Sequence, residues 1–164
     1  MAIAQGRDPF DLFGEWYAGA EDCGLKEPTA VMLATADEAG RPSARMVLLK
    51  GYDESGFVFY TNLESRKGRQ LSVNPYAALC FHWMPLGRQI RIEGPVSAVS
   101  EQEADAYFAS RPKDSQIGAW ASKQSSPLQG MLALEKRVAK YALKYGIGKV
   151  PRPDFWSGFR LAPE

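Results

Sequence analysis

Short strand-like runs separated by tight turns occupy the middle of the chain, and they restrict the possible fold more than any other feature. Each run is rich in apolar, β-branched and aromatic residues, which suit a pleated, half-buried strand. The runs predict strands at 30–36, 42–52, 56–61, 76–84 and 89–97. Because turns of a few residues join the first three strands, we expect these in meander order. Several short antiparallel strands linked in this way indicate a small barrel.

Helical periodicity flanks and interrupts the strands. Apolar side chains recur every three or four residues in segments bounded by capping residues, proline or glycine. The predicted helices span 8–22, 65–74, 100–111, 113–120 and 126–146. In the last of them, which starts at Ser126-Pro127, the apolar face carries Met131, Leu134, Val138, Tyr141 and Tyr145.

Residues 1–164 are predicted to form a single domain, mainly β with helices (α+β), because this length buries one core and no repeat or low-complexity tract divides it. Its predicted parts are an N-terminal helix at 8–22, a barrel at 30–97, a helical part at 100–146 and a final strand at 155–161.

Composition excludes several classes of function. The formal net charge of +1 argues against a nucleic-acid or membrane-surface binder, so any anion site must be local. No run approaches the roughly 18 apolar residues of a membrane span, and the N-terminus lacks an apolar signal region, so we expect a cytoplasmic protein. His82 is the only histidine, and Cys23 and Cys80 lack metal-ligand spacing. We therefore expect neither a metal site nor a histidine-assisted nucleophile.

The segment 60–68 runs from the end of a predicted strand into a helix that starts with two adjacent cations, Arg66 and Lys67. Ser65 is suited to cap this helix, so the free backbone N–H groups and the positive end of the helix dipole would point the same way as the two cations. This pattern predicts a site for a phosphate dianion. The alternative is a solvated basic turn.

Further cations stand at Arg45 and Lys50, which flank an apolar run. Because they are five positions apart, a regular strand would place them on opposite faces, which implies two sites or a bulge. Tyr107 and Arg111 share one helical face, and Ser115 lies near the start of the next helix. These three residues predict a second anion site, although a Tyr–Arg pair is also a common surface contact.

Together, these segments resemble the FMN-binding core of the pyridoxamine (pyridoxine) 5′-phosphate oxidase family. The similarity covers roughly residues 8–164, in the family's order. The segments that carry it are Arg45-Met46-Val47-Leu48-Leu49-Lys50, Tyr60-Thr61-Asn62, Ser65-Arg66-Lys67, Gln89-Ile90-Arg91-Ile92-Glu93-Gly94, Tyr107-Phe108-Ala109-Ser110-Arg111-Pro112, Ser115-Gln116-Ile117-Gly118-Ala119-Trp120 and Ser122-Lys123-Gln124-Ser125-Ser126. The resemblance implies an FMN-binding split β-barrel whose active sites lie at a homodimer interface.

The resemblance also implies roles for individual residues. Arg66 and Lys67 would hold the FMN phosphate. The ribityl chain and ring would contact Arg45, Met46, Val47, Leu48, Leu49, Tyr60, Thr61 and Gln89. Gln124 and Ser125 would reach the flavin of the other subunit. The substrate's 5′-phosphate would contact Lys50, Tyr107, Arg111 and Ser115, which include the second predicted anion site.

The implied activity is FMN-dependent oxidation of pyridoxamine 5′-phosphate or pyridoxine 5′-phosphate to pyridoxal 5′-phosphate, with O2 as electron acceptor. No catalytic side chain is expected, because the flavin carries the chemistry. Two alternatives stay open: a non-catalytic FMN- or pyridoxal-phosphate-binding protein, and a related flavin oxidase of another aromatic substrate, such as a phenazine precursor. The preference for amine or alcohol also stays open.

In the family, a further segment follows the part that matches 155–161, with a flavin-contacting Trp and an Arg-x-His-x-Arg cluster. This sequence ends at Glu164. Either the sequence is shortened relative to the working enzyme, or this member lacks part of the site. We expect the barrel and the FMN phosphate site to be independent of that segment, and substrate orientation to depend on it.

Overall fold

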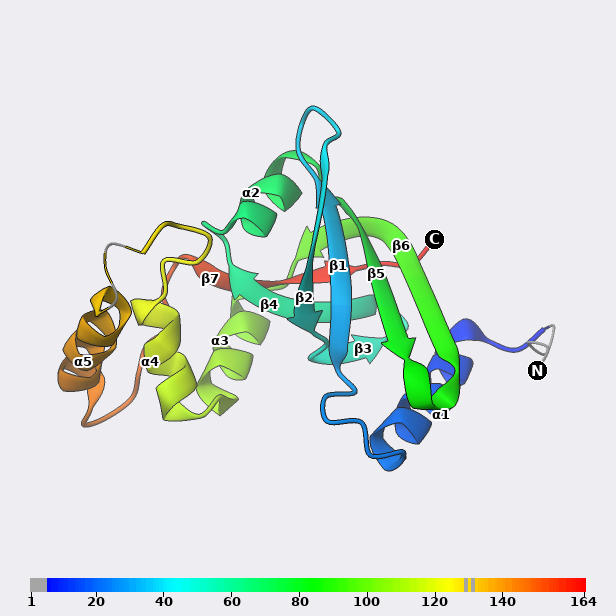
Figure 1. The fold of residues 1–164 in the computed structure, drawn as a ribbon, viewed down its shortest axis with the longest axis horizontal. Coiled ribbons are helices and arrows are strands. Elements are labelled where there is room, and N and C mark those ends of the chain that lie inside the picture. The colour runs from blue at the N-terminus through cyan, green and yellow to red at the C-terminus, as the bar shows by residue number, and fades with distance from the viewer. Residues whose placement is uncertain (1–5, 129, 131) are drawn as a thin grey trace.

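Seven antiparallel strands form one sheet that curls into a half-barrel (Figure 1), in a computed structural model that describes residues 6–128, 130 and 132–164. The strands are β1 Ala30–Ala36, β2 Pro42–Leu48, β3 Gly51–Asp53, β4 Gly56–Asn62, β5 Tyr76–Trp83, β6 Arg88–Ala98 and β7 Trp156–Leu161. The helices are α1 Pro9–Asp22, α2 Arg66–Val73, the 3-10 helix η1 Met84–Leu86, α3 Glu101–Ser110, α4 Lys113–Ala121 and α5 Ala133–Tyr145. The predicted split-barrel class, mainly β with peripheral helices, is confirmed.

The sheet has the order β2-β1-β5-β6-β7-β4-β3, so its edge strands are β2 and β3. Only Leu49 and Lys50 separate these two strands in the chain. The Leu49 amide donates to the Thr29 carbonyl at 2.9 Å, and the Lys50 amide donates to the Val58 carbonyl at 2.8 Å. The chain therefore changes its pairing partner between consecutive residues, and the backbone itself joins the two edges of the curled sheet.

The prediction of one strand over 42–52 is therefore wrong, because this segment forms two strands. The predicted meander neighbours do pair, β1 with β2 and β3 with β4, but through these two separate strands. β4 pairs with β3 and β7, not with β2. β7 lies between β6 and β4, so the final strand is part of the barrel. Strand propensity reports local conformation, whereas the pairing of Phe57 with Leu161 depends on how distant segments pack.

The last helix also starts later than predicted, at Ala133 instead of Ser126-Pro127. Ser125, directly before the predicted start, lies in a turn and has a left-handed φ of 62°. The side chain of Gln124 bonds to β4 and α2, which holds this segment against the barrel. Met131, predicted on the apolar face of this helix, lies outside the described residues. The remaining predicted elements match to within one residue at each end.

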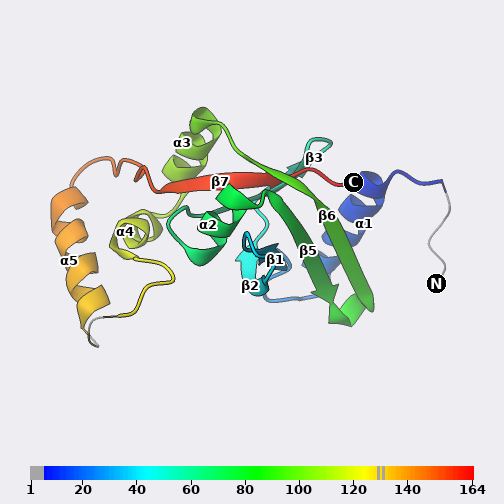
Figure 2. The same cartoon turned by 90° about the horizontal axis from the view of Figure 1, so that it is seen from above.

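Helix α1 covers one end of the barrel. Phe13, which is 3% exposed, makes edge contacts with the rings of Tyr52, Phe57 and Phe81. Figure 2 shows that α3, α4 and α5 lie beyond the opposite end. No helix in the described part of the chain is long and apolar enough to cross a bilayer.

Candidate functional site

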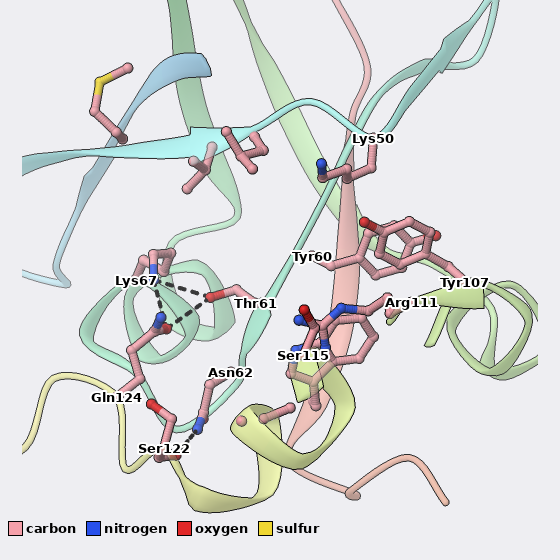
Figure 3. Close-up of a pocket in the computed structure, with 16 residues that line it drawn as sticks. Lys50, Tyr60, Thr61, Asn62, Lys67, Tyr107, Arg111, Ser115, Ser122 and Gln124 are labelled. Carbon is pink, nitrogen blue, oxygen red and sulfur yellow. Dashed lines mark hydrogen bonds between the residues drawn. The ribbon is translucent and has the colours of Figure 1, made fainter. Parts of the chain in front are cut away.

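A pocket of about 440 Å³ lies between the barrel and the helices α3 and α4 (Figure 3). This volume is within the range of roughly 300–1,000 Å³ that is typical of small-molecule sites. Seven of the twelve residues predicted to bind the cofactor and all four predicted for the substrate line it. These are Met46, Val47, Leu48, Tyr60, Thr61, Lys67 and Gln124, and Lys50, Tyr107, Arg111 and Ser115.

Five predicted site residues do not line the pocket. Leu49 is a core residue, 4% exposed, and Ser125 follows Gln124 in the segment after α4. Arg45 and Arg66 lie close enough to each other to interact electrostatically beside the pocket. Gln89, on β6, pairs with His82 of β5 and is not among the residues that line the pocket.

Lys67 forms one end of the pocket. It is only 7% exposed, and its ammonium donates to Gln124 Oε1 at 2.9 Å and to Thr61 Oγ1 at 3.1 Å. Burial, and secondly the charge of Arg45, lower the pKa of Lys67 to about 8. The predicted cap is also present, since Ser65 Oγ accepts from the Gly68 amide at 3.2 Å. The helix start, its cap and the cation therefore converge as the sequence pattern indicated.

Arg45 adds a second cation at this end. Its guanidinium donates to Thr35 Oγ1 at 2.6 Å and to Ser43 Oγ at 2.6 Å, and burial lowers its pKa, as does the charge of Arg66. Within the described residues, no carboxylate forms an ion pair with Arg45, Arg66 or Lys67. A cluster of cations without a counterion favours an anionic ligand, which would offset their mutual repulsion.

Arg111 forms the other end of the pocket, and Figure 3 shows Lys50, Tyr107 and Ser115 around it. Its guanidinium carbon lies 4.8 Å from the centre of the Trp156 ring. Among the described side chains, Arg111 Nη1 is the buried nitrogen that lacks a hydrogen-bond partner. Burial lowers the Arg111 pKa, while Tyr107 opposes that shift. An unused donor in a basic pocket indicates a second site for an acceptor group.

Aromatic rings form a wall at this end of the pocket. Tyr60 stacks on Tyr107 at a centroid distance of 4.0 Å, and on Trp156 at 5.3 Å. Burial, and secondly the charge of Glu103, raise the pKa of Tyr60 to about 12, so its hydroxyl keeps its proton at neutral pH. Five lining residues are not among the residues predicted for the site: Asn62, Gly118, Ala119, Ser122 and Trp156. Trp156 carries no local signal, since only the placement of β7 brings it here.

The curled antiparallel sheet has the split-barrel fold of FMN-binding proteins, and a basic, aromatic pocket lies at its side. A family model described as pyridoxamine 5′-phosphate oxidase matches residues 20–145. The chain belongs to the pyridoxamine 5′-phosphate oxidase family, as its motifs predicted.

Relatives named pyridoxine/pyridoxamine 5′-phosphate oxidase support this assignment. The one from Rhodospirillum rubrum is 60% identical over 169 residues, covering 100% of this chain and 84% of the relative. The one from Rhizobium meliloti is 59% identical, covering 95% of this chain and 76% of the relative. These names indicate an oxidoreductase family.

Two solved structures are similar in fold. PhzG from Burkholderia lata 383, in complex with tetrahydrophenazine-1-carboxylic acid, has a TM-score of 0.90 and 34% identity, covering 97% of this chain and 78% of that one. A pyridoxamine 5′-phosphate oxidase-related, FMN binding protein from Nostoc punctiforme has a TM-score of 0.72 and 17% identity, covering 99% of this chain and 83% of that one. The second similarity bears on the fold alone.

Proposed function

We propose that this chain binds FMN and oxidises pyridoxamine 5′-phosphate or pyridoxine 5′-phosphate to pyridoxal 5′-phosphate, with O2 as the electron acceptor. The observation that carries the proposal is one pocket with a separate basic group at each end, Lys67 at one and Arg111 at the other. A phosphorylated cofactor and a phosphorylated substrate together need two anion sites. Family membership supports the same activity.

The Lys67 end fits the phosphate of FMN. Arg45, Arg66 and Lys67 bring positive charge to the start of α2, and a phosphate dianion would compensate it. The flavin ring supplies the two-electron acceptor when FMN is bound. No carboxylate or histidine is among the described lining residues, so the chain's own side chains contribute binding and orientation.

The Arg111 end fits the substrate. Arg111 Nη1 is an unused donor, and Lys50, Tyr107 and Ser115 supply further donors around it. Anchoring a phosphate here would place the pyridine ring next to the aromatic wall and away from Lys67. This orientation favours a flat, phosphorylated aromatic substrate.

Replacing Arg111 by alanine is expected to weaken pyridoxal 5′-phosphate binding about tenfold to a hundredfold, the loss of one charge-assisted phosphate contact. FMN content should not change, because Arg111 lies at the other end of the pocket from Lys67. Equilibrium titration of the FMN-loaded protein, with pyridoxal as the unphosphorylated control, measures the effect. Release of FMN from this variant would show that the two ends form a single site.

We further propose a homodimer whose interface includes the outer face of β1 and β2. Met32 and Met46 are directly opposite each other there, and they are 40% and 62% exposed. Met46 also lines the pocket, so a second copy seated on this face would complete the pocket wall. Exposed apolar side chains beside a binding site are typical of an interface.

The proposed interface also suggests a role for Gln89, which does not line the pocket described above. The sheet register aligns Met46, Met32, Cys80 and Arg91 in one row. Gln89 shares a face with Arg91, because alternate strand residues point the same way. We therefore propose that Gln89 contacts the partner's flavin. Because Gln124 bonds to Lys67, we propose that it serves the flavin of its own chain, and not that of the other subunit as the sequence resemblance implies.

The dimer should have about twice the 18.1 kDa chain mass in light scattering. Met32→Glu places a charge at the centre of the proposed interface and should shift the protein to monomers. Leu143→Glu is the matched control, since Leu143 is 88% exposed on α5. A monomeric unmodified chain would refute the proposed interface.

FMN affinity should fall as pH rises from 7 to 9. The Lys67 pKa lies near 8 in the free protein, so higher pH removes the charge that attracts the phosphate, which is itself a dianion throughout this range. The loss approaches tenfold per pH unit above the pKa. Riboflavin, which lacks the phosphate, should show no such dependence in the same titration, and a flat FMN profile would contradict this role of Lys67.

Oxygen consumption by the FMN-loaded chain, with pyridoxamine 5′-phosphate, pyridoxine 5′-phosphate and unphosphorylated pyridoxine as substrates, tests the activity. Turnover confined to the phosphorylated compounds is expected. FMN binding without turnover would instead favour the non-catalytic alternative.

The similarity to PhzG favours a second candidate, an oxidase of a phenazine precursor. Oxygen consumption with a reduced phenazine carboxylate discriminates the two candidates. The buried, unused donor of Arg111 favours the phosphorylated substrate.

A further inference from the structure

Gln70, on α2, connects the buried polar groups beneath the Lys67 end of the pocket. Its Oε1 accepts from Thr35 Oγ1 at 2.7 Å, from Ser43 Oγ at 2.8 Å and from Arg45 Nη2 at 3.3 Å. Gln70 is 5% exposed and Thr35 is 4% exposed, so these bonds are shielded from water. Four groups from α2, β1 and β2 therefore hold each other in place.

The partners of Arg45 are all neutral. Its guanidinium contacts two hydroxyls, one amide oxygen and the carbonyls of Leu33 and Ser43. The chain fixes other arginines differently, since Arg152 pairs with Glu101 and Asp105, and Arg160 pairs with Asp53 and Glu103. Unlike these two arginines, Arg45 is held by neutral acceptors alone.

The choice of acceptor determines how much charge Arg45 can offer to a ligand. An arginine stays protonated in proteins, so a neutral acceptor fixes its position and leaves its charge uncompensated. A carboxylate at the same place would fix it equally well but form a local ion pair. Lys67 is also held by neutral acceptors, because its hydrogen-bond partners are the hydroxyls of Thr61 and Ser65 and the amide oxygen of Gln124.

We propose that Gln70 is a positioning residue that holds Arg45 toward the flavin phosphate while leaving its charge free, and that this neutrality determines the preference for FMN over riboflavin. The inference rests on the proposed FMN site. Gln70 and Lys67 are three residues apart on α2, so one helix face carries both the cation and the group that orients its neighbour.

Gln70→Glu tests the inference, because it keeps the shape of the side chain and adds one negative charge beside Arg45. FMN affinity should fall about tenfold to a hundredfold, as one charge-assisted phosphate contact is lost. Riboflavin affinity should stay unchanged, because riboflavin has no phosphate. Fluorescence titration of the apoprotein with each flavin measures both values.

Ser43→Asp is a second test at a half-buried position that tolerates change more readily, and it decides the question if Gln70→Glu does not fold. Ser43→Asn is its neutral control, with the same shape and no charge. Loss of FMN affinity in the Asp variant alone supports the proposal. Unchanged FMN affinity in the charged variants, or an equal loss for both flavins, would overturn it. An unmodified chain that binds no FMN would overturn the proposed function itself.

Discussion

Replacing Lys67 by methionine is expected to lower FMN affinity a few hundredfold while riboflavin affinity stays unchanged. Methionine keeps the length of the buried side chain and removes its charge. Truncating one member of a buried charge pair costs about 2–5 kcal/mol, because the opposite charge then stays buried without a partner. Lys67 is 7% exposed and lines the pocket, so water compensates little of this loss.

Titration of the apoprotein with FMN and with riboflavin, at pH 7, separates charge from packing. Lys26→Met, at an exposed position, is the matched control and should bind both flavins normally. The Lys67 variant should also lose the pH dependence of FMN binding, since the titrating group is gone. Equal weakening of both flavins would mean that Lys67 supports the pocket wall and does not bind the phosphate.

The cap and the cations of the proposed phosphate site were predictable because their signal is local. Ser65, Arg66 and Lys67 are consecutive, and a cap followed by cations has the same meaning in any helix start. The structure has this cap, with Ser65 accepting from Gly68. The grouping of Tyr107 with Arg111 was predictable for the same reason, because residues four apart share one helix face. The structure places both of them, together with Ser115, in one pocket.

The closure of the barrel was not predictable from local pattern. The run from 42 to 52 has uninterrupted strand propensity, and yet the chain changes partner between Leu49 and Lys50. The backbone between Arg45 and Lys50 is therefore not a regular strand, and the two cations serve different ends: Arg45 lies beside the Lys67 end, and Lys50 lines the pocket near Arg111. Only the pairing of both sheet edges, a tertiary property, determines where the strand breaks.

Gln70 and Trp156 were missed for a related reason. A glutamine inside a helix and a tryptophan at the start of a strand are ordinary residues, and their sequence neighbours give no sign of a site. Gln70 acquires its role from Arg45 on a different element, and Trp156 from the insertion of β7 beside β4. Supporting residues of this kind can be recognised only once the three-dimensional structure shows which distant residues they contact.

Gly68→Ala is expected to destabilise the protein by about 2–4 kcal/mol, although alanine is favoured over glycine inside a helix by about 1 kcal/mol. A Cβ at Gly68 would lie 2.2 Å from the carbonyl oxygen and 2.7 Å from the Cα of Leu63. Both are backbone atoms of the turn that joins β4 to α2, so no side chain can move aside. The first turn of α2 would have to shift away from β4, and Lys67 would shift with it relative to Thr61.

Thermal unfolding of the apoprotein measures this effect, with an expected fall in Tm of about 5–15 °C for a chain of this size. Gly118→Ala is the matched control, because Gly118 is also helical and a Cβ there would meet no atom within 4 Å. The control should be neutral or slightly stabilising. Since Lys67 shifts as well, FMN affinity should fall in the Gly68 variant even at temperatures where it stays folded. An unchanged Tm would mean that the turn and the first turn of α2 can move apart without cost, which would contradict the close packing of Gly68 on Leu63.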